Sequence, residues 1–247
     1  MLILIWAELV KFKRSPILRL MGALLLVHFF WHFSLARSQV TSWPVFLNAT
    51  YMDLWLRPAL FTCLAAYVVC RDRQYHALGS FLSTPHTRSG WYLAKLTVAA
   101  IMITILLSVS FIIDLVLGWF FMELPLTPSI LQDSLIEFTM NLLFYWALVP
   151  IGAWIGLFLR SFITSVLLGL TIIFVNLVWG AFLLEPPFHW LFLLNPWILP
   201  HLLSYAPQNL PSVEMWRPGI AILLSWWFVF ASVGGFMFQK RDVGSGE

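Results

Sequence analysis

Long apolar runs alternate with shorter polar stretches along the whole chain. An α-helix rises about 1.5 Å per residue, so about 20 apolar residues cross the roughly 30 Å hydrocarbon core of a bilayer. The pattern therefore predicts six transmembrane helices, at residues 17–35, 54–70, 91–121, 135–159, 162–184 and 216–238. We expect an all-α membrane protein in which residues 1–247 form a single transmembrane domain.

Residues 188–199 are also apolar but are too few to cross a bilayer as a helix. Prolines, which lack a backbone N–H and interrupt helices, lie in and around this run at Pro186, Pro187, Pro196 and Pro200. We predict that residues 186–200 form a re-entrant or interfacial segment on the extracellular side.

Residues 1–16 carry apolar and charged side chains at the spacing of an amphipathic helix lying on the membrane surface. The face expected toward lipid contains Leu2, Ile5, Trp6, Leu9 and Val10. The face expected toward water contains Glu8, Lys11 and Lys13, and Arg14 follows it. The alternative is a segment that frays in solution. Attraction of the basic residues to anionic headgroups favours the interfacial helix.

The composition supports a membrane protein. Apolar residues make up 61% of the chain and charged residues 10%, whereas about a quarter of a soluble domain is charged. The formal net charge of +3 is small and does not indicate a nucleic-acid partner.

The distribution of lysine and arginine predicts the orientation, because these residues concentrate in cytoplasmic loops. With the N-terminus inside, the inner segments hold eleven of them and the outer segments three, namely Arg37, Arg57 and Arg217. We therefore expect a multi-pass protein of the cell membrane with both termini in the cytoplasm.

Sequence signatures of catalysis are missing from the chain. It contains no phosphate-binding loop, no H-E-x-x-H and no G-x-S-x-G. We predict no catalytic site.

Two histidines, His28 and His32, are spaced to project from one face of the first span. Metal ligands use this spacing, but no acid or thiol lies near them in the sequence. Their neighbours are aromatic, which favours packing or an interfacial belt over a metal site, and we predict no metal.

Two polar residues within the predicted spans need partners or solvent. Asp114 lies roughly 35 Å along its helix from Trp91, so we expect a solvated carboxylate near the outer surface, with a substrate pathway as the alternative. Asn176 lies mid-span, where its amide needs an interhelical hydrogen bond or lines a pathway.

Small residues predict where helices approach closely. Gly152-x-x-x-Gly156 lies in the fourth predicted span and Gly234-Gly235 in the sixth. Such spacing favours close helix packing and does not by itself identify a dimer face.

The loop at residues 71–90 joins the second and third spans. Tyr75, Leu78, Phe81 and Leu82 form an apolar stripe on a short predicted helix, which Thr84-Pro85 ends. Such a helix lies on lipid or docks in a groove of another protein.

The chain resembles the permeases of type-2 ATP-binding-cassette (ABC) exporters. In the loop the similarity lies in Gly79, Phe81-Leu82, Ser83-Thr84-Pro85, Arg88 and Ala94-Lys95-Leu96. The opening, residues 7–15, is similar to that of bacitracin-exporter and lantibiotic-immunity permeases, and residues 238–243 are similar to the family's last segment. The family usually has a Glu where this chain has Arg71-Asp72-Arg73, which leaves open whether Asp72 supplies that carboxylate.

The resemblance implies the membrane subunit of an ATP-driven exporter in the bacterial inner membrane. Its expected partners are ABC ATPase subunits, which bind ATP and Mg, and a second copy of itself or a homologous permease. The expected substrate is an amphiphile such as an antimicrobial peptide, a drug or a lipid-like compound, which suggests a role in antibiotic resistance. The loop would be the coupling helix that contacts the ATPase, through Tyr75, Leu78, Gly79, Phe81, Leu82, Ser83, Pro85 and Arg88.

Two other functions stay open from the residues alone. An ion-coupled secondary transporter would need buried acids, of which the predicted spans offer Asp114. A membrane assembly or scaffold protein would need no pathway or catalytic group.

Overall fold

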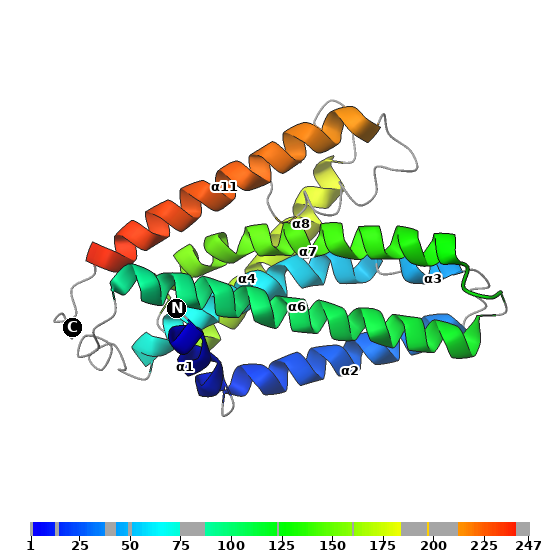
Figure 1. Ribbon diagram of the computed structural model, residues 1–247, viewed down its shortest axis with the longest axis horizontal. Helices are drawn as coiled ribbons and strands as arrows, with labels where there is room; N and C mark the ends of the chain where they lie inside the picture. The colour runs from blue at the N-terminus through cyan, green and yellow to red at the C-terminus, as the bar shows by residue number, and fades with distance from the viewer. Residues whose placement is uncertain are drawn as a thin grey trace.

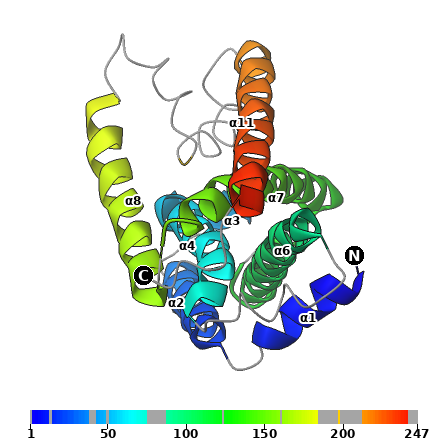
Figure 2. The same ribbon diagram turned by 90° about the vertical axis from the view of Figure 1, so that its left-hand side faces the viewer.

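The chain forms a bundle of long helices in the computed structural model (Figures 1 and 2). The structure describes residues 2–12, 15–37, 43–48, 51–74, 87–122, 124–159, 161–183, 197 and 212–240, and every regular element among them is an α-helix. The helices are α1 (Leu2–Phe12), α2 (Pro16–Arg37), α3 (Trp43–Asn48), α4 (Tyr51–Gln74), α6 (Arg88–Phe121), α7 (Pro128–Gly156), α8 (Phe162–Leu183) and α11 (Ser212–Lys240). The prediction of an all-α fold is confirmed for this part of the chain.

Each of the six predicted spans coincides with one long helix: α2, α4, α6, α7, α8 and α11. Within the described residues, four stretches are long and apolar enough to cross a membrane: Arg19–Arg37, Arg88–Phe121, Pro128–Gly156 and Ile220–Lys240. The chain is therefore a multi-pass membrane protein. Six crossings remain a prediction, since the four stretches do not include α4, and α8 contributes a shorter apolar stretch, Ile163–Val175.

Of the predicted re-entrant segment at 186–200, the structure describes Trp197. Its indole Nε1 donates a hydrogen bond to Thr62 Oγ1 of α4 at 2.9 Å. The remainder of that segment lies outside the described residues, and its re-entrant or interfacial character stays a prediction.

Helix α4 is the centre of the bundle. Its side chains are buried without interruption from Phe61 to Asp72, and it packs against α6, α7 and α8. Viewed along the bundle, α4 lies among these neighbours, while α8 and α11 stand at the periphery (Figure 2).

The close approach predicted from glycine spacing is confirmed, and the partner of α7 is α4 of the same chain. A Cβ built on Gly152 would lie 2.6 Å from the carbonyl oxygen of Thr62, and one on Gly156 would lie closer still to the carbonyl oxygen of Ala66. In α11, a Cβ on Gly234 would meet the hydroxyl of the Tyr92 side chain on α6, a contact that the tyrosine can relieve by moving. Gly152 and Gly156 bring the axes of α7 and α4 together because a side chain at either position would collide with the backbone of α4.

The short helices α1 and α3 lie at opposite ends of the bundle (Figure 1). At one end α1 lies across the bundle and packs on α6 (Figure 1). At the other, the indole of Trp43 in α3 donates to the carbonyl of Leu124 at 2.7 Å, and its ring covers Gly118 of α6. We call these the α1 end and the α3 end.

Candidate functional sites at the two ends of the bundle

Five charged residues at the α1 end form what we call the ionic cluster: Glu8, Lys11, Arg71, Asp72 and Lys95. Glu8 pairs with Lys11 at 2.5 Å, with Arg71 at 3.1 Å and with Lys95 at 3.4 Å. Asp72 forms an ion pair with Lys95 and lies 3.5 Å from Lys11. The cluster therefore joins α1, the end of α4 and the start of α6.

Four members of the ionic cluster are buried: Glu8 is 0% exposed, Lys95 1%, Asp72 2% and Arg71 3%. The prediction that Glu8 faces water is wrong. A buried carboxylate is tolerated when cations surround it, and here the cations are Lys11 of α1 itself, Arg71 of α4 and Lys95 of α6. The apolar residues of α1 divide between two environments. Leu2, Trp6 and Val10 are exposed, as a lipid-facing side requires, whereas Ile5 and Leu9 pack against the core.

The ionic cluster flanks both ends of the predicted coupling loop. Arg71 and Asp72 belong to the last turn of α4, and Lys95 lies about two turns into α6. Arg88, the first residue of α6, donates from Nη1 to the backbone carbonyl of Gln239 in α11 at 2.7 Å. Helices α1 and α11 are thus attached directly to the helices that enter and leave this loop.

Several predicted site residues lie outside the described part of the chain. These are Lys13 and Arg14 after α1, and Tyr75, Leu78, Gly79, Phe81, Leu82, Ser83 and Pro85 in the loop. Asn176 belongs to α8, but its side chain is not among those described.

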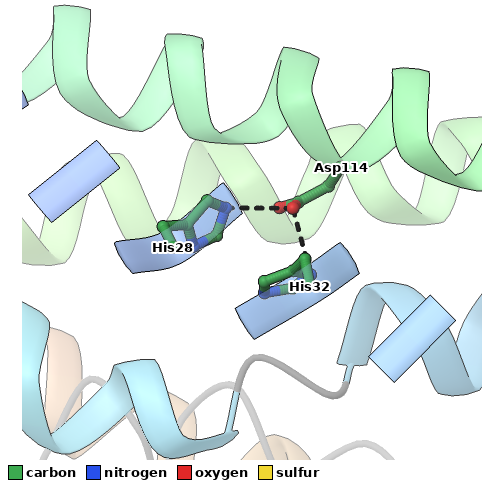
Figure 3. A group of neighbouring side chains, drawn as sticks. All are labelled: His28, His32 and Asp114. Carbon is green, nitrogen blue, oxygen red and sulfur yellow. Dashed lines mark hydrogen bonds and ion pairs between the residues drawn. The ribbon is translucent and has the colours of Figure 1, made fainter. Parts of the chain in front are cut away.

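At the other half of the bundle, two histidines of α2 converge on one carboxylate of α6, which we call the His-His-Asp triad (Figure 3). His28 Nε2 lies 2.9 Å from Asp114 Oδ1, and His32 Nδ1 lies 3.1 Å from the same oxygen. All three residues are buried. The expectation that Asp114 is a solvated helix-end carboxylate is wrong, because the α2 histidines lie over it.

A small pocket of about 50 Å³ adjoins the triad between α4, α6 and α7. Asp114 lines it together with Arg57, Ser134, Glu137 and Asn141, while apolar residues of α3, α6 and α7 close the rest. Arg57 also lies close to the triad, with Nη2 3.4 Å from His28 Nδ1. The second site therefore adjoins a pocket that polar and apolar side chains line together.

Comparison with known protein families decides the class of this bundle. A family described as "ABC-2 family transporter protein" matches residues 4–176, which is well over half of the chain. The chain belongs to this family. No curated protein sequence matches it. The matched region includes the ionic cluster and the triad.

The ABC-2 permease is thus the membrane subunit of an ABC transporter, a class that works with an ABC ATPase in the membrane. This bears out the resemblance at the level of the family. The finer likeness to bacitracin-exporter and lantibiotic-immunity permeases stays a prediction.

Sequence reasoning missed the pairing within both sites of the ABC-2 permease. One signal was present: Lys95 lies inside the third predicted span, where a buried ammonium needs a carboxylate. Charge balance would have pointed to Glu8 and Asp72, which border the apolar runs. No comparable signal links His28 to Asp114, because 86 residues separate them.

The surroundings of Asp72 in the ionic cluster predict how acid affects the stability of the permease. Asp72 lies beyond the predicted span at 54–70, and burial alone would raise its pKa. The adjacent Lys95, Lys11 and Arg71 outweigh burial and hold that pKa below its ordinary value of 3.8. Since the folded pKa is the lower one, Asp72 stabilises the fold above pH 3.8 and loses this contribution as the pH falls below that value.

We expect the melting temperature of the detergent-purified permease to fall more steeply on acidification from about pH 5 to about pH 3 than that of Asp72→Asn. Thermal unfolding of both proteins across this range measures the difference. Equal slopes would contradict the charged state assigned to Asp72.

Proposed function

We propose that this ABC-2 permease couples ATP hydrolysis by a separate nucleotide-binding subunit to the export of an amphiphilic substrate. Candidate substrates are antimicrobial peptides, drugs and lipid-like compounds. The observation that carries the proposal is the ionic cluster, which holds both helices bordering the coupling loop against α1. Family membership supplies the ABC context, and the division of labour agrees with a sequence that has no phosphate-binding loop or catalytic motif.

The proposed mechanism is mechanical. ATP binding closes the ATPase subunits on one another. The closing subunits press on the coupling loop, which they contact through the stripe of Tyr75, Leu78, Phe81 and Leu82. The pressure enters the bundle through the end of α4 and the start of α6. Glu8 and Lys95 bind the end of α4 and the start of α6 to each other and to α1. The three helices therefore move as one body. Arg88 passes the displacement on to α11 through the carbonyl of Gln239.

The complete transporter in this proposal contains two permease domains and two ATPase subunits. The second permease is another copy of this chain or a homologue, and ATP and Mg are bound by the ATPases. The α1 end faces the cytoplasm of a bacterial inner membrane, in agreement with the lysine and arginine distribution.

The coupling step is tested by the double substitution Phe81→Asp and Leu82→Asp. Two carboxylates cannot be buried in an apolar groove without a large desolvation cost. We expect ATP hydrolysis by the reconstituted complex in vesicles to fall at least about tenfold, with loss of co-purification of the ATPase. Ser80→Asp, which adds charge to the same loop beside the stripe, is the control and is expected to keep turnover.

Unchanged turnover after both stripe substitutions would refute the assignment of the coupling helix. Transport that follows a proton or sodium gradient without ATP would instead favour an ion-coupled transporter.

A further inference from the structure

We propose that His28, His32 and Asp114 form a binding site for a divalent transition-metal ion of the zinc class. The inference goes beyond the proposed export function and does not depend on it. It rests on the arrangement of three ligating side chains from two helices (Figure 3) and on the small pocket beside them.

The ligand types and their spacing match a three-residue zinc site. Zinc is bound by two imidazole nitrogens and one carboxylate oxygen in many proteins, with a fourth position left for water or another ligand. Bond lengths of about 2.0–2.1 Å in a tetrahedral site place the ligand atoms about 3.3 Å apart. The triad already holds two of its separations at 2.9 and 3.1 Å, and all three ligand atoms lie within 4.8 Å of one another.

The helices explain why the ligands are pre-arranged. His28 and His32 are one helical turn apart on α2, and their ring centroids lie 4.3 Å from each other. The ring of Phe46 in α3 stands edge-on to the ring of His32, with 5.6 Å between the two ring centroids. This aromatic contact shields His32 from water and strengthens the attraction of its imidazole to a cation.

The pocket beside the triad provides space for a fourth ligand of the proposed metal ion. Asp114 also lines the pocket of about 50 Å³, which has room for water molecules. Ser134, Glu137 and Asn141 supply oxygen atoms at its wall. A fourth ligand such as water could therefore approach the Asp114 side of the site from this pocket.

Arg57 is expected to weaken metal binding because its guanidinium contacts His28. A guanidinium only donates hydrogen bonds, so its contact with His28 Nδ1 at 3.4 Å makes that nitrogen the acceptor. The proton of a neutral His28 then resides on Nε2 and is donated to Asp114. To bind metal through Nε2, His28 must move this proton to Nδ1 and release Arg57. Removal of the guanidinium should therefore tighten metal binding, whereas removal of a ligand should abolish it.

The experiment titrates Co²⁺ and Zn²⁺ into the full-length permease purified in detergent. We expect about one Co²⁺ per chain, with the visible absorption bands of tetrahedral coordination, and a rise in melting temperature on addition of Zn²⁺. His32→Asn and Asp114→Asn should each weaken binding at least about 100-fold. Arg57→Gln should tighten it several-fold. Asp133→Asn, which removes an exposed carboxylate of α7, is the control and should leave it unchanged.

The wild-type spectrum tests the proposal even if a ligand variant fails to fold. Absence of tetrahedral Co²⁺ bands in the wild-type protein would overturn it. Binding that survives both ligand substitutions would also overturn it, because the metal would then be held elsewhere, for example by other histidines of the chain. Weaker binding in Arg57→Gln would contradict the proposed competition between the guanidinium and the metal.

Discussion

Replacing Glu8 by Gln is expected to destabilise the permease by about 3–5 kcal/mol, the usual cost of breaking a buried ion pair from one side. Glu8 is fully buried and pairs with three cations, two of which, Arg71 and Lys95, are themselves buried. The amide of Gln fills the same space but leaves these cations with Asp72 as the remaining carboxylate of the cluster. Thermal or denaturant unfolding in detergent measures the loss.

Two further proteins separate this effect from a general loss of charge. Asp133→Asn removes a carboxylate from an exposed position and should change stability by no more than about 0.5 kcal/mol. A double-mutant cycle of Glu8→Gln with Arg71→Gln should give a coupling energy of about 1–3 kcal/mol. Additive losses would show that Glu8 and Arg71 do not stabilise one another.

Leucine at Gly156 is expected to cost about 3 kcal/mol or more, at the upper end of the usual penalty for overpacking. The atoms that its Cβ would meet belong to the backbone of Ala66 in α4, which cannot rotate away as a side chain can. Helices α4 and α7 would have to separate, and α4 is the centre of the bundle. The melting temperature of the purified protein reports the change.

Gly22→Leu is the matched control for this substitution. Gly22 lies on an exposed face of α2, and a Cβ there would have no heavy atom within 4 Å. Leucine also has a higher helix propensity than glycine, so this variant should be as stable as the wild type or slightly more so. Equal stabilities of the Gly156 and Gly22 variants would contradict the α4–α7 packing.

The helices could be predicted from the sequence because lipid imposes a simple rule on it. Apolar runs of about 20 residues mark the six long helices, and prolines or polar clusters mark their limits. Gly152 and Gly156 likewise predicted a close helix approach, although the spacing could not identify α4 as the partner. The sequence of one helix shows which of its faces can pack closely. It does not show which other helix packs there.

The polar sites could not be predicted because their members meet only in the folded bundle. The helical spacing of α1 predicted that Glu8 faces water. The prediction failed because its partners Arg71 and Lys95 lie far from Glu8 in the sequence. The depth estimate for Asp114 took account of its own helix alone. Burial came from α2, whose His28 and His32 cover the carboxylate, and from Phe46 of α3 beside His32.

The ionic cluster also has a consequence for biosynthesis. A ribosome makes Glu8 more than sixty residues before Arg71 and nearly ninety before Lys95. The carboxylate is therefore already present when the segments that carry these cations enter the bilayer. Each cation therefore has a carboxylate of the same chain available as a partner when its helix packs against α1.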